Sequence, residues 1–280
     1  FVLLTTGGTG GHVFPAEALA DALTRRGVRL ALATDRRGHA YPGALSNIER
    51  HQIHAAPMAG RSVPKLFKAS VEMAWGYLQA RRLLRRLRPQ AVIGFGGYAS
   101  VPVMLAASRL GVPTILHEQN AVMGRANRLL APRVTTIATS FPTTRHLRPM
   151  DEAKRLLTGN PVREAFHAVC EQPHPPLGPE DPFVVLILGG SQGTHIFADV
   201  VPKALAALAP ETRKRLRITQ QCRPEDLAAV NAQYKALGIE ADIAAFFDDV
   251  PERFAKAHLI VSRAGASTVA ELAAAGRPAV

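Results

Sequence analysis

The sequence has few cysteines, the residues that cross-link small secreted domains and bind structural metals. Its 280 residues include only two cysteines, Cys170 and Cys222, with no CxxC spacing and no ligand-like histidine pattern around them. This scarcity argues against a disulfide framework or a structural zinc site and favours a reducing, cytosolic setting. No apolar run approaches the roughly 20 residues that a membrane-spanning helix needs. The first residues lack the charged n-region of a signal peptide, so none is expected there.

Acidic residues are also scarce: 22 Asp and Glu stand against 34 Lys and Arg, a net charge of +12. This excess favours an anionic partner, which is a nucleic acid, a membrane surface or a phosphorylated substrate. Much of the charge lies near one aromatic segment, and no RNA-type aromatic platform is present. We therefore expect an anionic membrane surface and no nucleic acid. The length leaves room for two domains, each with its own core.

The first stretch reads as a strand, a tight glycine loop and the start of a helix. Val2, Leu3 and Leu4 precede four glycines and His12, and Pro15 opens a segment with apolar residues at helical spacing. A helix start presents N–H groups and partial positive charge, so the pattern favours an anionic or nucleotide-like ligand. The alternative is a tight turn without a ligand.

A dinucleotide-binding loop is the rival interpretation of this stretch. Gly8 and Gly10 fit G-x-G-x-x-G, and Asp35 closes the next strand where a ribose-binding acid belongs. However, Val13 stands where the third glycine is required. We therefore interpret Asp35 as a strand-end residue rather than as part of an NAD(P) site.

The strand, loop and helix pattern recurs along the chain. It returns at 91–111, at 183–208 and at 258–276, and polar residues His117, Glu118, Gln119 and Asn120 end another strand. This alternation predicts an α/β fold of two Rossmann-like domains with parallel sheets facing a shared cleft. The proline-rich segment 171–182 is interpreted as the connection between the halves.

Residues 61–90 combine broad apolar surface with many basic side chains, and Glu72 is their only acid. One interpretation is a core-facing helix with a solvated basic end. The sharper hypothesis is an interfacial helix whose aromatics enter lipid while basic residues meet anionic headgroups. The expected membrane contacts are Lys65, Leu66, Phe67, Lys68, Trp75, Arg81, Arg82 and Arg85.

Six motifs occur in the order found in the MurG family of GT-B glycosyltransferases, which this chain resembles over its whole length. They are GGTGGHVFPA, GFGGYASVPV, HEQNAVMGRAN, TGNPVR, LGGSQG and SRAGASTVAELAAAGRPAV. The resemblance implies transfer of N-acetylglucosamine from UDP-GlcNAc to the C4 hydroxyl of MurNAc in lipid I, the undecaprenyl-pyrophosphoryl-MurNAc-pentapeptide. The product is lipid II for peptidoglycan. The family inverts the anomeric centre without a metal ion, and no cofactor is expected.

The resemblance also implies which substrate each domain binds and where in the cell the protein lies. An acceptor- and membrane-binding domain over 1–162 would precede a UDP-GlcNAc-binding domain over 163–280, which we expect to stop short of the family's C-terminal end. The protein would lie peripherally on the cytoplasmic face of the bacterial inner membrane.

The donor contacts implied by the resemblance come from both halves. They are Thr9, Gly10, Gly11, Asn120, Arg163, Ser191, Phe247, Ala266, Ser267, Thr268, Val269 and Glu271. Arg163 and Ser191 would stabilise the pyrophosphate whose charge grows as the glycosidic bond breaks. Glu271 would accept hydrogen bonds from the ribose hydroxyls, and Phe247 would read uracil through its backbone.

Inversion needs a base that takes the proton of the acceptor hydroxyl. His12 is the first candidate, because histidine accepts a proton near neutral pH. Glu118 is the second candidate, and a purely structural His12 is the alternative. Gly96, Gly97, Tyr98 and His117 are expected to bind the acceptor.

Overall fold

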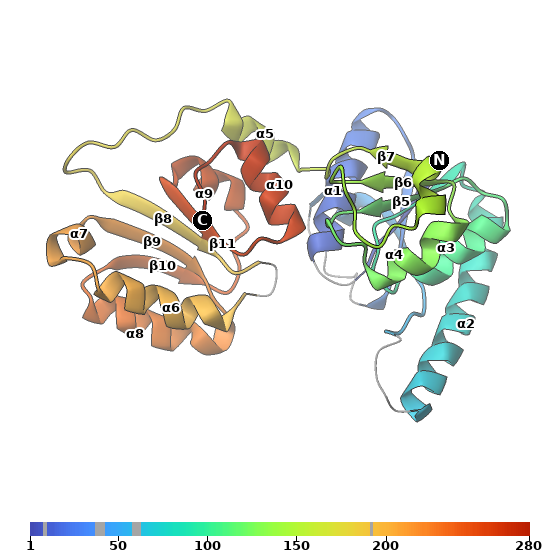
Figure 1. Ribbon diagram of the computed structural model, residues 1–280, viewed down its shortest axis with the longest axis horizontal. Helices are drawn as coiled ribbons and strands as arrows, with labels where there is room; N and C mark the ends of the chain where they lie inside the picture. Colours follow the sequence, from blue (N-terminus) through green and yellow to red (C-terminus); the bar gives the residue numbers. More distant parts are fainter. Residues whose placement is uncertain (8–9, 37–42, 58–62, 191–192) are drawn as a thin grey trace. The chain divides into compact units, whose positions relative to one another are not determined.

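The computed structural model describes residues 1–7, 10–36, 43–57, 63–190 and 193–280 (Figure 1). The chain divides into two compact units, Phe1–Pro161 and Val162–Val280. Each unit has a parallel sheet with helices on both faces, as an alternation of strands and helices produces. The predicted α/β class with parallel sheets is confirmed.

The first unit is built on a seven-stranded sheet in the order β3-β2-β1-β4-β5-β6-β7. Its strands are β1 (Val2–Thr5), β2 (Leu30–Thr34), β3 (Glu49–Gln52), β4 (Ala91–Gly94), β5 (Thr114–Glu118), β6 (Thr136–Thr139) and β7 (Arg155–Leu157). Every pairing is parallel. Parallel strands end at the same edge, so the segments that follow β1, β4 and β5 are neighbours.

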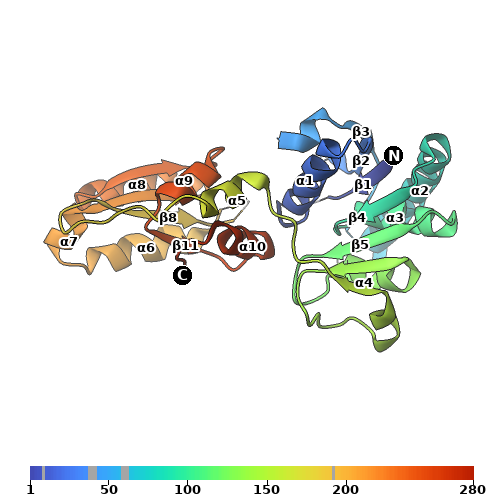
Figure 2. The same cartoon turned by 90° about the horizontal axis from the view of Figure 1, so that it is seen from above.

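Helices cover both faces of this sheet. They are α1 (Gly10–Arg25), α2 (Val63–Leu87), α3 (Ser100–Arg109) and α4 (Arg125–Leu130), with 3₁₀ helices η2 (Gly43–Asn47), η3 (Ala131–Arg133) and η4 (Pro149–Lys154). Leu4 packs with Val13 and Ala16 of α1, whereas Leu3 packs with Leu84 of α2 and Met104 of α3. Alternate residues of β1 therefore serve two cores, with α1 on one face and α2 and α3 on the other (Figure 2).

The second unit has a four-stranded sheet in the order β10-β9-β8-β11. Its strands are β8 (Phe183–Leu188), β9 (Leu216–Gln221), β10 (Glu240–Ala244) and β11 (Leu259–Ser262). Its helices are α5 (Glu164–Cys170), α6 (His195–Ala206), α7 (Pro210–Lys214), η5 (Pro224–Asp226), α8 (Leu227–Ala236), α9 (Val250–Lys256) and α10 (Ala266–Ala275). Helices α6 and α8 lie on one face, and α5, α9 and α10 lie on the other (Figure 1).

The differences from the sequence predictions include two strands and the start of one helix. The edge strands β3 and β7 were not predicted, because Glu49–Gln52 carries no apolar alternation and β7 has only three residues. Helix α1 begins at Gly10 rather than at Pro15. Pro15 cannot donate a helical hydrogen bond, but Val13 is 4% exposed and its burial favours the earlier start.

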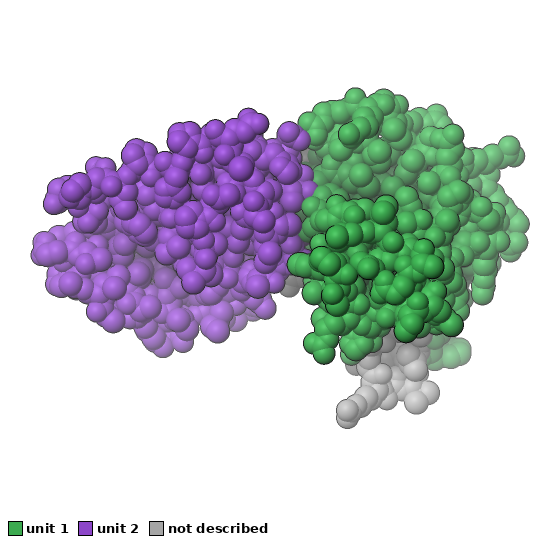
Figure 3. Space-filling model, turned by 45° about the horizontal axis from the view of Figure 1, so that its top comes forward, with its two compact units in different colours: residues 1–161 green, residues 162–280 purple. Residues whose placement is uncertain are grey.

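The interpretation of 171–182 as the connection between the halves is wrong. Phe166 and Val169 of α5 pack with Leu186 and Phe254 in the second unit. The division falls at Pro161 and Val162, so the proline-rich segment lies inside the second unit (Figure 3).

We expect Gly97→Ala to destabilise the first unit more than Gly111→Ala. Both glycines have left-handed backbones, with φ of +76° and +73°. A Cβ on Gly97 would lie 2.5 Å from the carbonyl oxygen of Gly7, whereas a Cβ on Gly111 meets nothing within 4 Å. Strain alone should cost Gly111→Ala about 1–2 kcal/mol, and displacement of the loop after β1 should raise the cost for Gly97→Ala to about 2–4 kcal/mol. Urea unfolding measures both, and equal costs would contradict the close approach.

Candidate active site

The candidate site of the first unit lies where β1, β4 and β5 end. His12 is in the first turn of α1, the segment 95–99 joins β4 to α3, and Gln119 and Asn120 follow β5. Because the three strands are adjacent and parallel, these segments meet at the carboxyl edge of the sheet. Open α/β sheets bind ligands at this edge.

The segments that follow β1 and β4 are in close contact. The Ser100 hydroxyl donates to the carbonyl of Gly96 at 2.6 Å and lies 3.2 Å from the carbonyl of Thr5. Gly96 has φ of +92°, and a Cβ there would lie 3.2 Å from Cε1 of His12. A glycine is therefore required beside the His12 ring, both for its backbone angle and for the space.

His12 is connected to buried polar residues at the end of β5. Its Nδ1 lies 3.1 Å from Oε1 of Gln119, whose Nε2 donates to the carbonyl of Phe95 at 2.9 Å and lies 3.1 Å from Nδ1 of His117. Nε2 of His117 lies 3.1 Å from the carbonyl of Gly159. Gln119 and His117 are 1% and 4% exposed. Burial lowers the pKa of His117, which keeps its imidazole neutral.

This arrangement argues against His117 as an acceptor-binding residue. Both of its ring nitrogens have partners inside the protein, and the ring is buried against Phe95. We therefore place His117 behind the site rather than in contact with a ligand.

Glu118 is enclosed by N–H donors. It is 1% exposed; Oε1 accepts from the backbone and side-chain nitrogens of Asn120, and Oε2 accepts from the Gly124 N–H and from Nδ2 of Asn127. These four distances run from 2.8 to 3.1 Å. A carboxylate so occupied and so buried is poorly suited to act as a base, and the geometry instead gives Glu118 the role of orienting Asn120 and the start of α4.

The candidate site of the second unit lies at the ends of β8 and β11, which are neighbours. Arg163, just before α5, donates from Nη2 to Oε1 of Glu271 at 2.8 Å, and its guanidinium lies 4.9 Å from the centre of the Phe166 ring. Glu271 lies in α10, whose first residues are Ala266 and Ser267. The structure thus pairs a cation with a carboxylate of α10, a ten-residue helix that follows β11.

Phe247 follows β10 and is 7% exposed. Its ring lies 4.0 Å from the guanidinium of Arg253, which also pairs with Asp242 at 2.6 Å and with Asp249 at 2.7 Å. The hydrogen bond from Arg253 holds the pKa of Asp249 below its ordinary value. Because the Phe247 ring is packed in the core, a ligand contact has to come from its backbone.

Most of the remaining predicted site residues lie at the candidate site of one unit or of the other. Gly10, Gly11, Gly97 and Tyr98 join His12 at the first edge, while Ala266, Ser267, Thr268 and Val269 form the first turn of α10. Thr9, Ser191 and the side chains of Lys65 and Leu66 lie outside the described residues. Among the residues that the structure describes, no three His, Cys, Asp or Glu side chains gather as a metal ion requires.

Sequence reasoning did not assign roles to Gln119, Gly124, Asn127 and Gly159. Gln119 carried a usable signal, because it belongs to the polar run that ends β5. The other three carried none, since their roles arise from contacts that only the fold creates.

The fold and the two strand-end sites define a class, the GT-B glycosyltransferases. A crystal structure of MurG from Acinetobacter baumannii matches with a TM-score of 0.69 and 29% identity, over 97% of this chain and 74% of the other. The UDP-GlcNAc 2-epimerase of Neisseria meningitidis shares the fold alone, with a TM-score of 0.64 and 16% identity over 100% of this chain and 81% of the other.

Residues 2–139 match the glycosyltransferase family 28 N-terminal domain, and residues 184–280 match its C-terminal domain. A Paramagnetospirillum magneticum protein is 54% identical over 100% of this chain and 75% of its own length. A Rhodospirillum rubrum protein is 56% identical over 100% of this chain and 71% of its own length. Both are named UDP-N-acetylglucosamine–N-acetylmuramyl-(pentapeptide) pyrophosphoryl-undecaprenol N-acetylglucosamine transferase. This chain belongs to glycosyltransferase family 28, among its MurG transferases.

We expect Glu118→Gln to lower the free energy of unfolding by roughly 2–4 kcal/mol. Whichever way the amide is turned, its NH₂ faces two of the N–H groups that Glu118 now accepts. Glu152→Gln is the matched control, because Glu152 is half exposed and pairs only with Arg155 among the described residues, so its loss should cost less than about 1 kcal/mol. Urea unfolding of both variants measures the difference. Similar small costs would show that the Glu118 carboxylate is not needed.

Proposed function

We propose that this chain transfers N-acetylglucosamine from UDP-GlcNAc to the C4 hydroxyl of MurNAc in lipid I, with inversion, and so produces lipid II for peptidoglycan synthesis. The observation that carries the proposal is the 54–56% identity, over the whole chain, to relatives whose names state this transfer. The MurG crystal structure with the same fold supports it.

The second unit binds the donor in this proposal. The pyrophosphate leaving group gains negative charge as the glycosidic bond breaks, and the starts of α6 and α10 direct N–H groups toward the same sheet edge. Arg163 adds a cation that Glu271 and Phe166 hold in place. Ser191 and the residues 266–269 complete the phosphate contacts, Glu271 meets the ribose and the backbone of Phe247 meets uracil.

The first unit binds the acceptor and supplies the base. His12 takes the proton of the C4 hydroxyl while that oxygen bonds to the anomeric carbon and UDP leaves with the electron pair. Gly96, Gly97 and Tyr98, at the start of α3, hold the acceptor pyrophosphate through backbone N–H groups. Asn120, oriented by Glu118, and residues 9–11 contact the donor sugar.

The first unit also meets the membrane. Phe67, Val71, Trp75 and Leu78 are exposed at helical spacing along α2, and Arg81, Arg82 and Arg85 follow them. Residues 1–161 contain 22 Lys and Arg against 8 Asp and Glu, a net charge of +14, whereas residues 162–280 contain 12 against 14 and carry −2.

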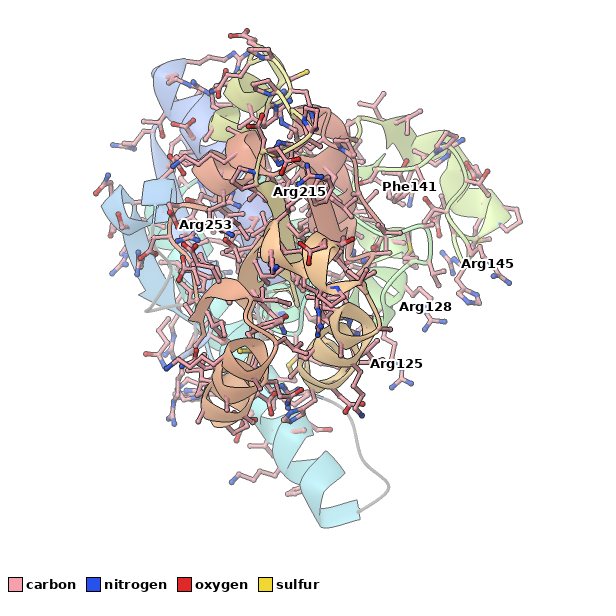
Figure 4. The ribbon with its side chains drawn as sticks, turned by 90° about the vertical axis from the view of Figure 1, so that its left-hand side faces the viewer. Arg125, Arg128, Phe141, Arg145, Arg215 and Arg253 are labelled. Atoms are coloured by element: carbon pink, nitrogen blue, oxygen red, sulfur yellow. The ribbon has the colours of Figure 1, made fainter. Side chains whose placement is uncertain are left out.

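Further arginines extend from the same unit: Arg125 and Arg128 from α4 and Arg145 from the loop after β6 (Figure 4). Among the described residues, none of the helices combines the length and apolar character needed to cross a bilayer. Exposed aromatics beside basic side chains support peripheral binding to anionic lipid, at the cytoplasmic face of the inner membrane.

The proposed chemistry predicts a large effect of His12→Ala on turnover. With UDP-GlcNAc and a lipid I analogue, kcat should fall by about 10²–10⁴ because the base is lost. The affinity for UDP-GlcNAc, measured by calorimetry, should change little, since the base acts on the acceptor oxygen. UDP-GalNAc is the donor control. Unchanged turnover would remove His12 from catalysis, and stabilisation of the wild type by NADH but not by UDP-GlcNAc would refute the transferase.

The membrane proposal predicts that Trp75→Glu weakens binding to vesicles containing anionic lipid. Leu156→Glu is the matched control: the two side chains are 50% and 57% exposed, but Leu156 lies on β7, the sheet edge opposite β3. Helix α2 lies beside the β3 edge, where Gln79 accepts from the N–H of His54. Co-sedimentation at two salt concentrations measures binding. Equal loss in both variants, or binding indifferent to lipid charge, would contradict α2 as the contact.

A further inference from the structure

The hydrogen bonds around Gln119 determine which way its amide faces. Nε2 lies 2.9 Å from the carbonyl oxygen of Phe95 and 3.2 Å from that of His117. Turned over, the amide would direct Oε1 at both carbonyl oxygens. The carbonyl of His117 would keep the Nδ2 donor of Asn127, but the carbonyl of Phe95 would lose the buried donor it has in this orientation. The orientation with Nε2 toward the carbonyls is therefore required, and Oε1 faces His12.

This orientation assigns the proton on His12. An amide oxygen only accepts, so Nδ1 of His12, 3.1 Å from Oε1, has to carry the hydrogen. In the neutral ring the other nitrogen, Nε2, then holds the lone pair. Of the two neutral tautomers, this is the one whose Nε2 can accept a proton.

The contacts of His117, which lies behind Gln119, support the same assignment. Nε2 of His117 lies 3.1 Å from the carbonyl of Gly159, so it donates, and Nδ1 of His117 accepts from Gln119. Burial lowers the pKa of His117, which agrees with a neutral ring that both donates and accepts. Donors and acceptors thus alternate consistently from His12 to the Gly159 carbonyl.

We propose that Gln119 is a positioning residue: backed by His117 and the Gly159 carbonyl, it holds His12 in the Nδ1–H tautomer and makes Nε2 the atom that takes the acceptor proton. The inference rests on the proposed function, in which His12 is the base. As the C4 oxygen bonds to the anomeric carbon, its proton passes to Nε2 and the bond to UDP breaks with its electron pair on UDP. Gln119 exchanges no proton and touches no substrate.

The tautomer is directly measurable in the wild-type protein. With ¹⁵N-labelled histidine at a pH above 8, where ordinary imidazoles are neutral, long-range ¹H–¹⁵N spectra distinguish protonated from unprotonated ring nitrogens. We expect His12 to carry hydrogen on Nδ1 and His117 on Nε2, with signals assigned from His12→Ala and His117→Gln. Hydrogen on Nε2 of His12 would overturn the proposal.

A variant tests the consequence for rate. Gln119→Leu should shift the His12 tautomer and lower kcat by about tenfold or more, with the KM for UDP-GlcNAc little changed. Gln220→Leu is the matched control, because Gln220 is equally buried but bonds to Tyr234 in the second unit; it should cost stability and leave the tautomer and kcat unchanged.

The possible failures are distinguishable. If His12→Ala keeps full turnover, His12 is not the base and the proposed mechanism fails. If His12→Ala loses turnover while Gln119→Leu leaves both the tautomer and kcat unchanged, the mechanism survives and the role of Gln119 is refuted.

Discussion

A carboxylate buried in a protein needs several N–H donors around it, and Glu118 imposes this requirement on residues 118–127. Its oxygens gather the backbone of Asn120 and Gly124 and the amide of Asn127. Because successive residues of an extended chain point to opposite sides, the side chains of His117 and Gln119 are turned away from this cluster, and Gln119 reaches His12. One short polar run thus serves two networks: Glu118 fixes the loop and α4, and Gln119 fixes the ring of His12.

The two units use charge differently. The first unit carries a net +14, and the attraction that the proposed function gives it for an anionic membrane would act within a Debye length of about 8 Å at physiological salt. The second unit is slightly acidic, so attraction for a phosphate has to be local. In the proposed function, Arg163, held by Glu271, and the helix starts at the same sheet edge provide it. A large charged surface suits a membrane, and a small oriented cation suits one pyrophosphate.

Steric requirements were predictable from the sequence, but long-range partners were not. Glycines such as Gly96 and Gly97 mark strand ends because the backbone there needs left-handed angles and close approach. Edge strand β3 carries no apolar alternation to predict it. Segment 171–182 showed an exposed, stiff composition, but composition does not reveal that Phe166 packs in the second core. The roles of Glu118 and His117 changed for the same reason: their partners, Asn127 and Gly159, come from elsewhere in the fold.

Gln119, a neutral residue that touches no substrate in the proposed mechanism, influences the rate of transfer because it sets the population of the reactive His12 tautomer. If the hydrogen of His12 moved to Nε2, the Nδ1 lone pair would face Oε1 of Gln119. A partly buried pair of acceptors that repel each other and lack a shared hydrogen costs roughly 1–3 kcal/mol, and every 1.4 kcal/mol is a tenfold change in population. Most molecules then present an Nε2 that accepts a proton. An amide partner achieves this without adding negative charge beside His12, whereas a carboxylate at position 119 would repel the anionic acceptor that the proposed function brings to the first unit.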